Sequence, residues 1–379
     1  MVERNYCMDY FNKDLIEFVL EVTETLQYLE RNPSELPTFP PLKRIHTEII
    51  KRYLSTERRF IGSGIDDRNR ELFPNNYQKL LTLFQLPLSE WGEGIFTKKE
   101  LKNLDLENFR FLDTYGLTDD CHYIYSEKES LFEFQSSAVA KALHYCRQYQ
   151  HQLDNAQKLY TKFRLFIQEH PVLNERELKQ FMMKGLLNTQ LSNYLEECYE
   201  PIRNYHYLLC PRCGWTMTKI TDSHYRCLTE ECEKQFDVTD TMGSLFQDAE
   251  LRTKKAVQFS TVISGLWEME LKTRLEKKGA VVELYPNLER YGDLEVKFQE
   301  DTFLIDVKNY RSSHTLLSKL QEELSQGKYH ESHTTIIAVP DHKSKAYVDF
   351  INEQVPLTLR VMRFKEIVKK ITNREVHHA

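Results

Sequence analysis

Apolar residues recur at helical spacing in four segments of the first half of the chain: residues 14–30, 43–54, 138–169 and 175–196. Side chains three and four positions apart lie on one face of an α-helix, so each segment predicts an amphipathic helical region. Proline and glycine residues interrupt the pattern between the segments, and residues 60–133 follow no regular period. We therefore expect a mostly α-helical domain over residues 1–205, with its many aromatic side chains packed in a core.

The pattern changes in the last third of the chain, where short apolar runs alternate with amphipathic segments. Trp267, Leu271 and Leu275 form one stripe of a helix that ends with basic residues and Gly279. After it, the pattern predicts a strand at 280–285, two strands joined by a turn at 299–301, a helix at 315–325 and a strand at 335–339. This alternation is typical of an α/β domain, which we place at residues 242–379.

The two strands joined by the turn carry ionisable side chains at their ends. Asp293 precedes an apolar run, and Asp306 and Lys308 close the next one. Residues two apart in a strand point to the same face, so Asp306 and Lys308 lie together. Two carboxylates and an ammonium group that converge can hold a divalent cation and a water, as metal-assisted phosphodiester cleavage requires. A solvated ion pair on an edge strand is the alternative, but the unbroken apolar run before Asp306 favours a buried strand.

In their order and spacing, these residues resemble the PD-(D/E)xK nuclease superfamily, which has the restriction-endonuclease-like fold with a mixed central sheet. Glu268 stands where the superfamily has a glutamate on its first helix. Asp293 matches the aspartate of the second core strand, and Asp306 with Lys308 matches the motif of the third. The chain departs from the pattern at Gly292, where the motif has a proline that is often missing in the superfamily.

The resemblance implies roles for these residues. Asp293, Asp306 and the backbone carbonyl of Val307 would bind Mg²⁺, which prefers oxygen ligands. Lys308 would orient or help deprotonate the attacking water and screen the charge that develops on the phosphate. Glu268 would steady a metal-bound water or a second ion. Glu270 would replace Glu268 if that side chain faces away, and Gln321 on the following helix is a weaker accessory candidate.

A second motif precedes this domain, in which thirteen residues separate the pair Cys210 and Cys213 from the pair Cys227 and Cys232. Four thiolates at this spacing predict a closed, structural Zn²⁺ site in a zinc ribbon over residues 206–241. His224 is an alternative ligand, because four residues rather than two separate the second cysteine pair. Loss of the zinc should unfold the ribbon locally and leave a distant nuclease core intact.

Disulfide bonds are the other interpretation of these cysteines, and we discount it. The chain shows no N-terminal hydrophobic signal segment, so we expect a reducing, cytoplasmic location. No run of eighteen apolar residues is present, which predicts no membrane span. The remaining cysteines have no motif spacing and are expected as small buried side chains: Cys7, Cys121, Cys146 and Cys198.

The length of 379 residues predicts two or three domains. The formal net charge of −6 arises upstream of residue 242, because Lys and Arg nearly balance Asp and Glu after it. Several basic residues lie on or just before the first helix of the α/β domain, where they suit phosphate contact and an ordinary solvated face equally well.

Together these features predict a multidomain protein: a helical domain, a zinc ribbon and a C-terminal Mg²⁺-dependent DNA endonuclease. The architecture is similar to that of the restriction-endonuclease-like proteins encoded beside prokaryotic PIWI-related Argonaute proteins and helicases. This resemblance implies a role in bacterial anti-phage or anti-plasmid defence. The expected partners are DNA, a second copy of the chain, and a helicase or Argonaute-like protein. The alternatives are a non-catalytic DNA-binding or scaffolding subunit, and an RNA or repair nuclease of the same fold.

Overall fold

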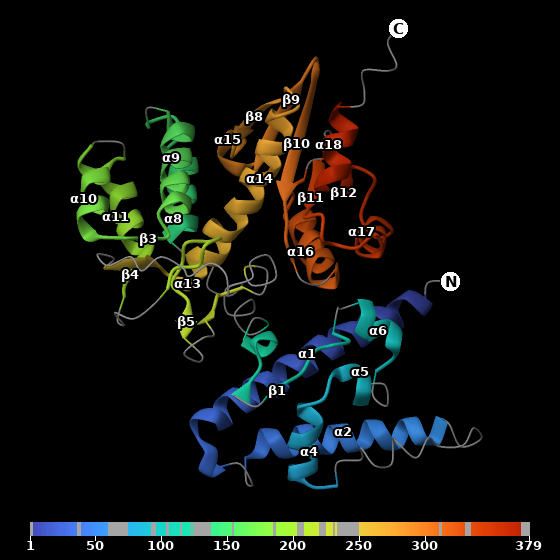
Figure 1. Cartoon of the computed structure of the whole chain (residues 1–379). Helices are drawn as coiled ribbons and strands as arrows, with labels where there is room; N and C mark the ends of the chain where they lie inside the picture. The colour runs from blue at the N-terminus through green and yellow to red at the C-terminus, as the bar shows by residue number, and fades with distance from the viewer. Residues whose placement is uncertain are drawn as a thin grey trace. The chain divides into compact units, whose positions relative to one another are not determined.

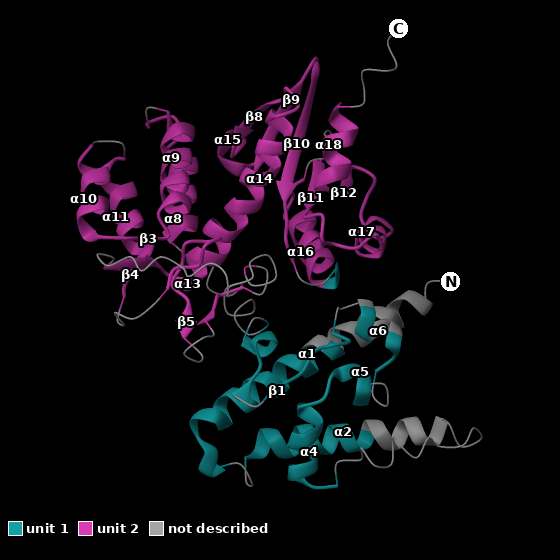
Figure 2. Ribbon diagram, in the orientation of Figure 1, with its two compact units in different colours: residues 1–126, 311–314 teal, residues 127–310, 315–379 magenta. Residues whose placement is uncertain are grey.

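A computed structural model describes most of the chain (Figure 1). The described residues are 3–35, 39–59, 75–91, 96–103, 106–113, 116–122, 124, 138–153, 155–184, 187–202, 208–219, 225–229, 232, 250–310, 313–329 and 335–372. The chain divides into two compact units (Figure 2). The first holds residues 1–126 and 311–314, and the second holds residues 127–310 and 315–379.

The first unit is mainly helical, as the apolar spacing predicts. Two long helices, α1 (Glu3–Arg31) and α2 (Pro40–Arg59), supply most of its regular structure. The aromatic side chains of Phe109 and Phe111 are buried in its core, which confirms packing as their role. Shorter elements complete the unit: η1 (Pro33–Glu35), α4 (Tyr77–Phe84), α5 (Leu88–Trp91), α6 (Lys98–Asn103), β1 (Leu112–Asp113) and β2 (Gly116–Leu117).

Four helices open the second unit: α8 (Ala138–Gln148), α9 (Ala156–Glu169), α10 (Glu175–Met183) and α11 (Thr189–Glu197). Two of the predicted helical segments are each broken into a pair. The side chain of Asn155 accepts a hydrogen bond from the amide of Lys158, and that of Asn188 accepts one from Leu191. Each asparagine therefore caps the start of a new helix, a local signal that apolar spacing alone does not register.

A small antiparallel sheet joins these helices to the C-terminal part of the unit. Its central strand β7 (Leu251–Thr253) pairs with β3 (Val172–Leu173) on one side and β4 (Tyr199–Pro201) on the other. The amide of Lys254 also donates to the carbonyl of Cys198 at 2.8 Å. One apolar core runs from α8–α11 into the C-terminal sheet and helices. The three-domain division at residues 205 and 241 stays a prediction.

The C-terminal part contains a mixed five-stranded sheet in the order β12-β11-β10-β9-β8. Strands β8, β9 and β10 are antiparallel neighbours, whereas β10, β11 and β12 run parallel. The strand and turn positions predicted up to residue 339 are confirmed, and β12 lies beyond that prediction. The bounds are β8 (Val281–Leu284), β9 (Leu294–Phe298), β10 (Asp301–Val307), β11 (Thr335–Val339) and β12 (Leu359–Arg363).

Helices cover both faces of this sheet (Figure 1). On β11, Ile336 and Ala338 share a core with α14 (Ser264–Glu276) and α18 (Phe364–Thr372). The alternate residues Ile337 and Val339 share another core with α16 (Ser313–Ser325) and α17 (Lys345–Asn352). Because strand side chains alternate between faces, an uninterrupted apolar strand can serve two helical layers at once.

Helix α14 continues directly from α13 (Lys255–Val257) through a π-helical turn at Gln258–Ile263. Its residues Trp267, Leu271 and Leu275 are buried, as the apolar stripe predicts. Among the described helices, none combines the length and apolar character needed to cross a lipid bilayer.

Candidate functional site

The two predicted metal-binding carboxylates meet between strands β9 and β10. Asp293 lies just before β9, where its amide donates to the carbonyl of Ile305 at 2.9 Å. The amide of Val307 donates to Asp293 Oδ2 at 2.8 Å. The carboxyl groups of Asp293 and Asp306 lie close enough to shift each other's pKa, and the two residues are only 9% and 1% exposed. The antiparallel pairing of β9 with β10 thus brings the acids close together, as the sequence predicts.

Gly292 allows this close approach. Its φ of +123° is open to glycine, whereas proline is restricted to about −65°. A Cβ atom at this position would lie 2.6 Å from the carbonyl oxygen of Ile305. Glycine is therefore required at this position, and it lets the backbone place Asp293 against β10.

Burial and neighbouring charges shift the pKa values of Asp293 and Asp306 in opposite directions. Burial, followed by the charge of Asp306, raises the pKa of Asp293 well above its ordinary value. Burial would also raise the pKa of Asp306, but the charges of Lys308 and Lys328 outweigh it, and its pKa lies below the usual range. Two buried carboxyl groups this close repel each other when both are ionised, so together they favour a bound proton or a cation. A divalent cation can take the place of such a proton, so this donor set fits a metal site.

Lys308 lies beside Asp306, as the spacing of the motif predicts. Its Nζ is 3.1 Å from Asp306 Oδ2, and its amide donates to the carbonyl of Ala338 at 2.9 Å. Burial would lower the pKa of Lys308, but the neighbouring charge of Asp306 raises it well above its ordinary value. Lys308 is therefore a charged ammonium group with its side chain 16% exposed.

Three further residues join this cluster, and the sequence analysis missed them. Glu323 on α16 lies 3.6 Å from Lys308 Nζ. Lys328 Nζ lies 2.9 Å from Asp306 Oδ2 and 3.1 Å from Glu323 Oε1. The hydroxyl of Tyr329 is a hydrogen-bond donor shared between the carboxylates of Asp306 and Glu323. The accessory candidate Gln321 is exposed, unlike Asp306 and Glu323, which are buried.

A signal for Glu323 was present in the sequence. Leu316 and Leu320 are fully buried on the inner face of α16, and Glu323 follows three residues after Leu320. It therefore continues the apolar stripe as an acid, which is costly unless the side chain has a partner. Lys328 and Tyr329 follow the end of the helix, where no periodicity applies.

Glu268 is buried at 1% exposed, whereas Glu270 pairs with Arg274 at the surface, so Glu268 is the inward-facing acid of α14. Its carboxylate accepts hydrogen bonds from Arg164 Nη2 at 2.8 Å and from the Tyr285 hydroxyl at 2.7 Å. A shared metal site would need the carboxylate oxygens of Glu268, Asp293 and Asp306 to lie within 4.8 Å of one another. Among the described residues, these three acids do not meet that condition. Glu268 is close enough for its charge to raise the pKa of Asp293, but it binds an arginine instead.

The four predicted cysteines lie together. Their Sγ atoms are within 4.8 Å of one another, and each residue is at most 5% exposed. The 3.6 Å between the sulfurs of Cys213 and Cys227 is far from a disulfide bond and close to the separation of about 3.8 Å that follows from tetrahedral coordination with 2.3 Å bonds. Hydrogen bonds among the sulfurs lower the pKa of Cys210 and raise those of Cys213 and Cys227, so the cluster favours one thiolate when no metal is bound. This cluster could hold zinc. His224 lies outside the described residues.

The cysteine cluster also packs against residues 253–267, at the start of the C-terminal α/β region. The expectation that the zinc ribbon lies far from the nuclease core is therefore wrong. Trp215 Nε1 donates to the carbonyl of Thr253 at 2.8 Å, and Gln258 Nε2 donates to that of Cys213 at 3.3 Å. The guanidinium of Arg212 lies 4.4 Å from the ring centre of Trp267. The cluster therefore contacts the segment that leads into α14 and Glu268. The scattered cysteines Cys121, Cys146 and Cys198 are buried as expected, whereas the side chain of Cys7 lies outside the description.

Comparison with protein families supports the resemblance drawn from the motifs. Residues 265–377 match a family model described as REase associating with pPIWI_RE. Comparisons with curated proteins and with solved structures found no match. The matched region contains Glu268, Asp293, Asp306 and Lys308, while helices α8–α11 and the cysteine cluster precede it. The C-terminal α/β region is thus similar to restriction-endonuclease-like domains linked to prokaryotic PIWI-related proteins.

Proposed function

We propose that this protein is a metal-dependent endonuclease that hydrolyses phosphodiester bonds in DNA. The observation that carries the proposal is the burial of Asp293 beside Asp306 in a region similar to restriction-endonuclease-like domains, with Lys308 Nζ 3.1 Å from Asp306 Oδ2. A buried pair of acids beside two lysines has no evident use in packing, because burying charges costs free energy. The same arrangement suits the binding of a cation and a phosphate.

The carboxylates of Asp293 and Asp306 and the carbonyl of Val307 would hold Mg²⁺, whose preferred ligands are oxygens. The bound ion would supply an activated water and polarise the scissile phosphate. Lys308 would orient the attacking water and offset the negative charge that develops on the phosphate. Lys328, with its side chain 27% exposed, adds a second ammonium group at the same acid.

The family match supports a biological setting for the proposal. A domain similar to nucleases that associate with pPIWI_RE proteins suits a defence enzyme that acts with an Argonaute-like protein and a helicase. Cutting both strands of a duplex needs two active sites, which favours a second copy of the chain. The four cysteines would hold one structural Zn²⁺, because four thiolates leave no open position for catalysis.

The test is cleavage by the purified full-length chain. Plasmid, linear duplex, single-stranded DNA and RNA would each be incubated with protein and Mg²⁺, with EDTA as the control. We expect cleavage of DNA that requires the cation. Cleavage of RNA alone would identify an RNA nuclease of the same fold. Binding of DNA with no cleavage of any substrate would support a non-catalytic DNA-binding subunit instead.

A further inference from the structure

Helix α9 lies outside the region matched by the family model, yet it delivers a cation to the predicted catalytic glutamate. Arg164 is 6% exposed, and its Nη2 lies 2.8 Å from Glu268 Oε1. Its other terminal nitrogen pairs with Glu289 Oε1. The guanidinium also lies 4.3 Å from the ring centre of Tyr285. Arg164 is therefore held by two acids and an aromatic face.

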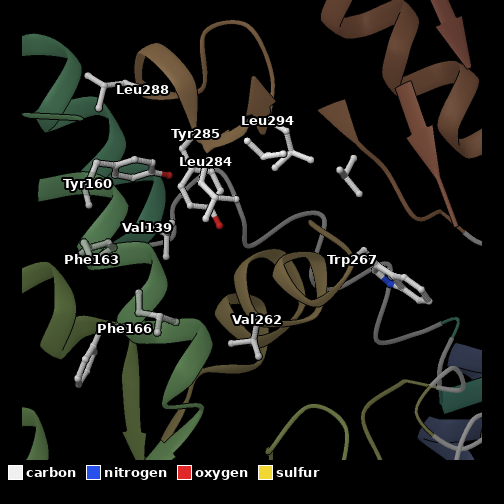
Figure 3. Packing of buried hydrophobic residues seen from close by; sticks show 14 of the residues in the cluster. Val139, Tyr160, Phe163, Phe166, Val262, Trp267, Leu284, Tyr285, Leu288 and Leu294 are labelled. Carbon is white, nitrogen blue, oxygen red and sulfur yellow. The ribbon is translucent and has the colours of Figure 1, made fainter. Parts of the chain in front are cut away.

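The second oxygen of Glu268 is also occupied. The Tyr285 hydroxyl donates to Glu268 Oε2 at 2.7 Å, and Gln168 Nε2 lies 3.5 Å from the same atom. Gln168 in turn donates to the Tyr285 hydroxyl at 2.7 Å. Figure 3 shows Tyr285 between the residues of α9 and those around β8, with Tyr160 beside it. Both oxygens of Glu268 thus accept hydrogen bonds, so the direction of its carboxylate is determined.

The backbone at residues 285–289 is strained, and side chains of α9 contact this strained segment. Tyr285, Asn287, Leu288 and Glu289 all have φ between +49° and +59°, a conformation that residues other than glycine rarely adopt. Tyr160 donates to Glu289 Oε1 at 2.8 Å, so the strained segment presents its acid to α9. This conformation places the Tyr285 ring against the Arg164 guanidinium and the Glu289 carboxylate in an ion pair with it. Residues 285–289 therefore form a binding site for the Arg164 guanidinium, and Tyr160 of α9 supports it through Glu289.

The ion pairs of Arg164 with Glu268 and Glu289 affect how the site can bind metal ions. A buried carboxylate needs a compensating cation, and arginine stays protonated in proteins. Metal ions can supply that positive charge in a nuclease, but at Glu268 the guanidinium already does so. We propose that Arg164 is a positioning residue that holds Glu268 in place of a second divalent cation, so the active site takes one metal ion at Asp293 and Asp306. This inference rests on the proposed nuclease function and adds the number of ions and the source of the second charge.

Metal binding without nucleic acid tests the inference. Mn²⁺ would be titrated calorimetrically into the zinc-loaded full-length chain, with Asp306→Asn and Glu268→Gln as variants. We expect one Mn²⁺ per chain, a Kd at least tenfold weaker in Asp306→Asn, and a Kd within threefold of wild type in Glu268→Gln. Two Mn²⁺ per chain, or equal weakening by both variants, would make Glu268 a metal ligand and overturn the role of Arg164.

Cleavage separates a positioning role from simple packing. Arg164→Gln should slow cleavage at saturating Mn²⁺ at least tenfold while keeping one Mn²⁺ per chain. The matched control is Arg147→Gln, which removes an arginine that donates to the Leu288 carbonyl in the same interface and does not contact Glu268. It should stay within threefold of wild type.

Equal losses in the two arginine variants would show that any interface contact suffices, which overturns the proposal. Arg164→Lys should recover little, because one ammonium group cannot bind both acids in the planar geometry of a guanidinium. If Arg164→Gln fails to fold, the Mn²⁺ count and the Glu268→Gln titration still decide. A chain that binds no Mn²⁺ and cleaves nothing would overturn the proposed function itself, and the inference with it.

Discussion

We propose that the cysteine cluster holds zinc, and removal of the zinc should destabilise the C-terminal α/β region as well as the cluster. The perturbation is Cys213→Ser, which removes one of the four candidate sulfur ligands at the residue whose backbone carbonyl accepts from Gln258. Metal binding supplies folding free energy to a segment of this size, so loss of the metal should unfold it. The contacts that the cluster makes with residues 253–267 would be lost together.

The structure sets the magnitude. Two buried hydrogen bonds, from Trp215 to Thr253 and from Gln258 to Cys213, contribute about 0.5–1.5 kcal/mol each. Two arginine–tryptophan contacts, Arg212 on Trp267 and Arg252 on Trp215, add about 0.5–1 kcal/mol each. The C-terminal α/β region should therefore lose about 2–5 kcal/mol, which corresponds to a fall of about 4–20 °C in its Tm at roughly 2–4 °C per kcal/mol.

The assay is thermal unfolding followed by circular dichroism, with zinc measured by elemental analysis in the same samples. Cys198→Ser is the matched control, because Cys198 is buried in the same unit but lies outside the cluster. Hydrogen exchange of the α14 amides would show whether the loss reaches Glu268. A zinc-free variant whose α14 exchanges at the wild-type rate, and whose Tm is unchanged, would refute the reasoning.

Three other substitutions test the packing and the charges around the site. Gly292→Ala should cost about 1–3 kcal/mol in denaturant unfolding and weaken Mn²⁺ binding, because φ is +123° and the new Cβ would meet the Ile305 carbonyl; wild-type Mn²⁺ affinity would contradict this account of Asp293. Leu271→Ala removes a fully buried side chain of α14 and should cost about 2–5 kcal/mol, whereas a cost below 1 kcal/mol would show that the helix is not part of the core. Lys328→Met should tighten Mn²⁺ binding severalfold and slow cleavage, since it removes an ammonium group 2.9 Å from Asp306 Oδ2; unchanged affinity would separate Lys328 from the site.

The part of the site that is local in sequence could be predicted. Strands β9 and β10 are joined by a short turn, so their pairing brings Asp293 to Asp306, and the period of two places Lys308 beside them. The cysteine spacing likewise predicted a cluster, which needs no knowledge of the rest of the fold. These contacts depend on short-range geometry that a sequence carries directly.

The contacts that join distant segments could not be predicted in this way. Arg164 precedes Glu268 by 104 residues, and nothing in an amphipathic helix marks one arginine for burial. The docking of the cysteine cluster depends on Trp215 meeting a carbonyl 38 residues later. Such pairs are decided by how whole elements pack. Glu323 is an intermediate case, since its place in the apolar stripe of α16 was visible but its partners were not.

The central claim is that Asp293, Asp306 and Lys308 form a metal-dependent phosphodiesterase site. It is tested most directly by single-turnover cleavage of end-labelled DNA with saturating Mg²⁺, comparing wild type with Asp306→Asn. The exposed Asp301→Asn on the same strand is the matched control. Loss of one metal ligand should slow cleavage by about 10²-fold or more, while Asp301→Asn cuts at the wild-type rate. Equal rates for wild type and Asp306→Asn under matched Mg²⁺ would contradict the account.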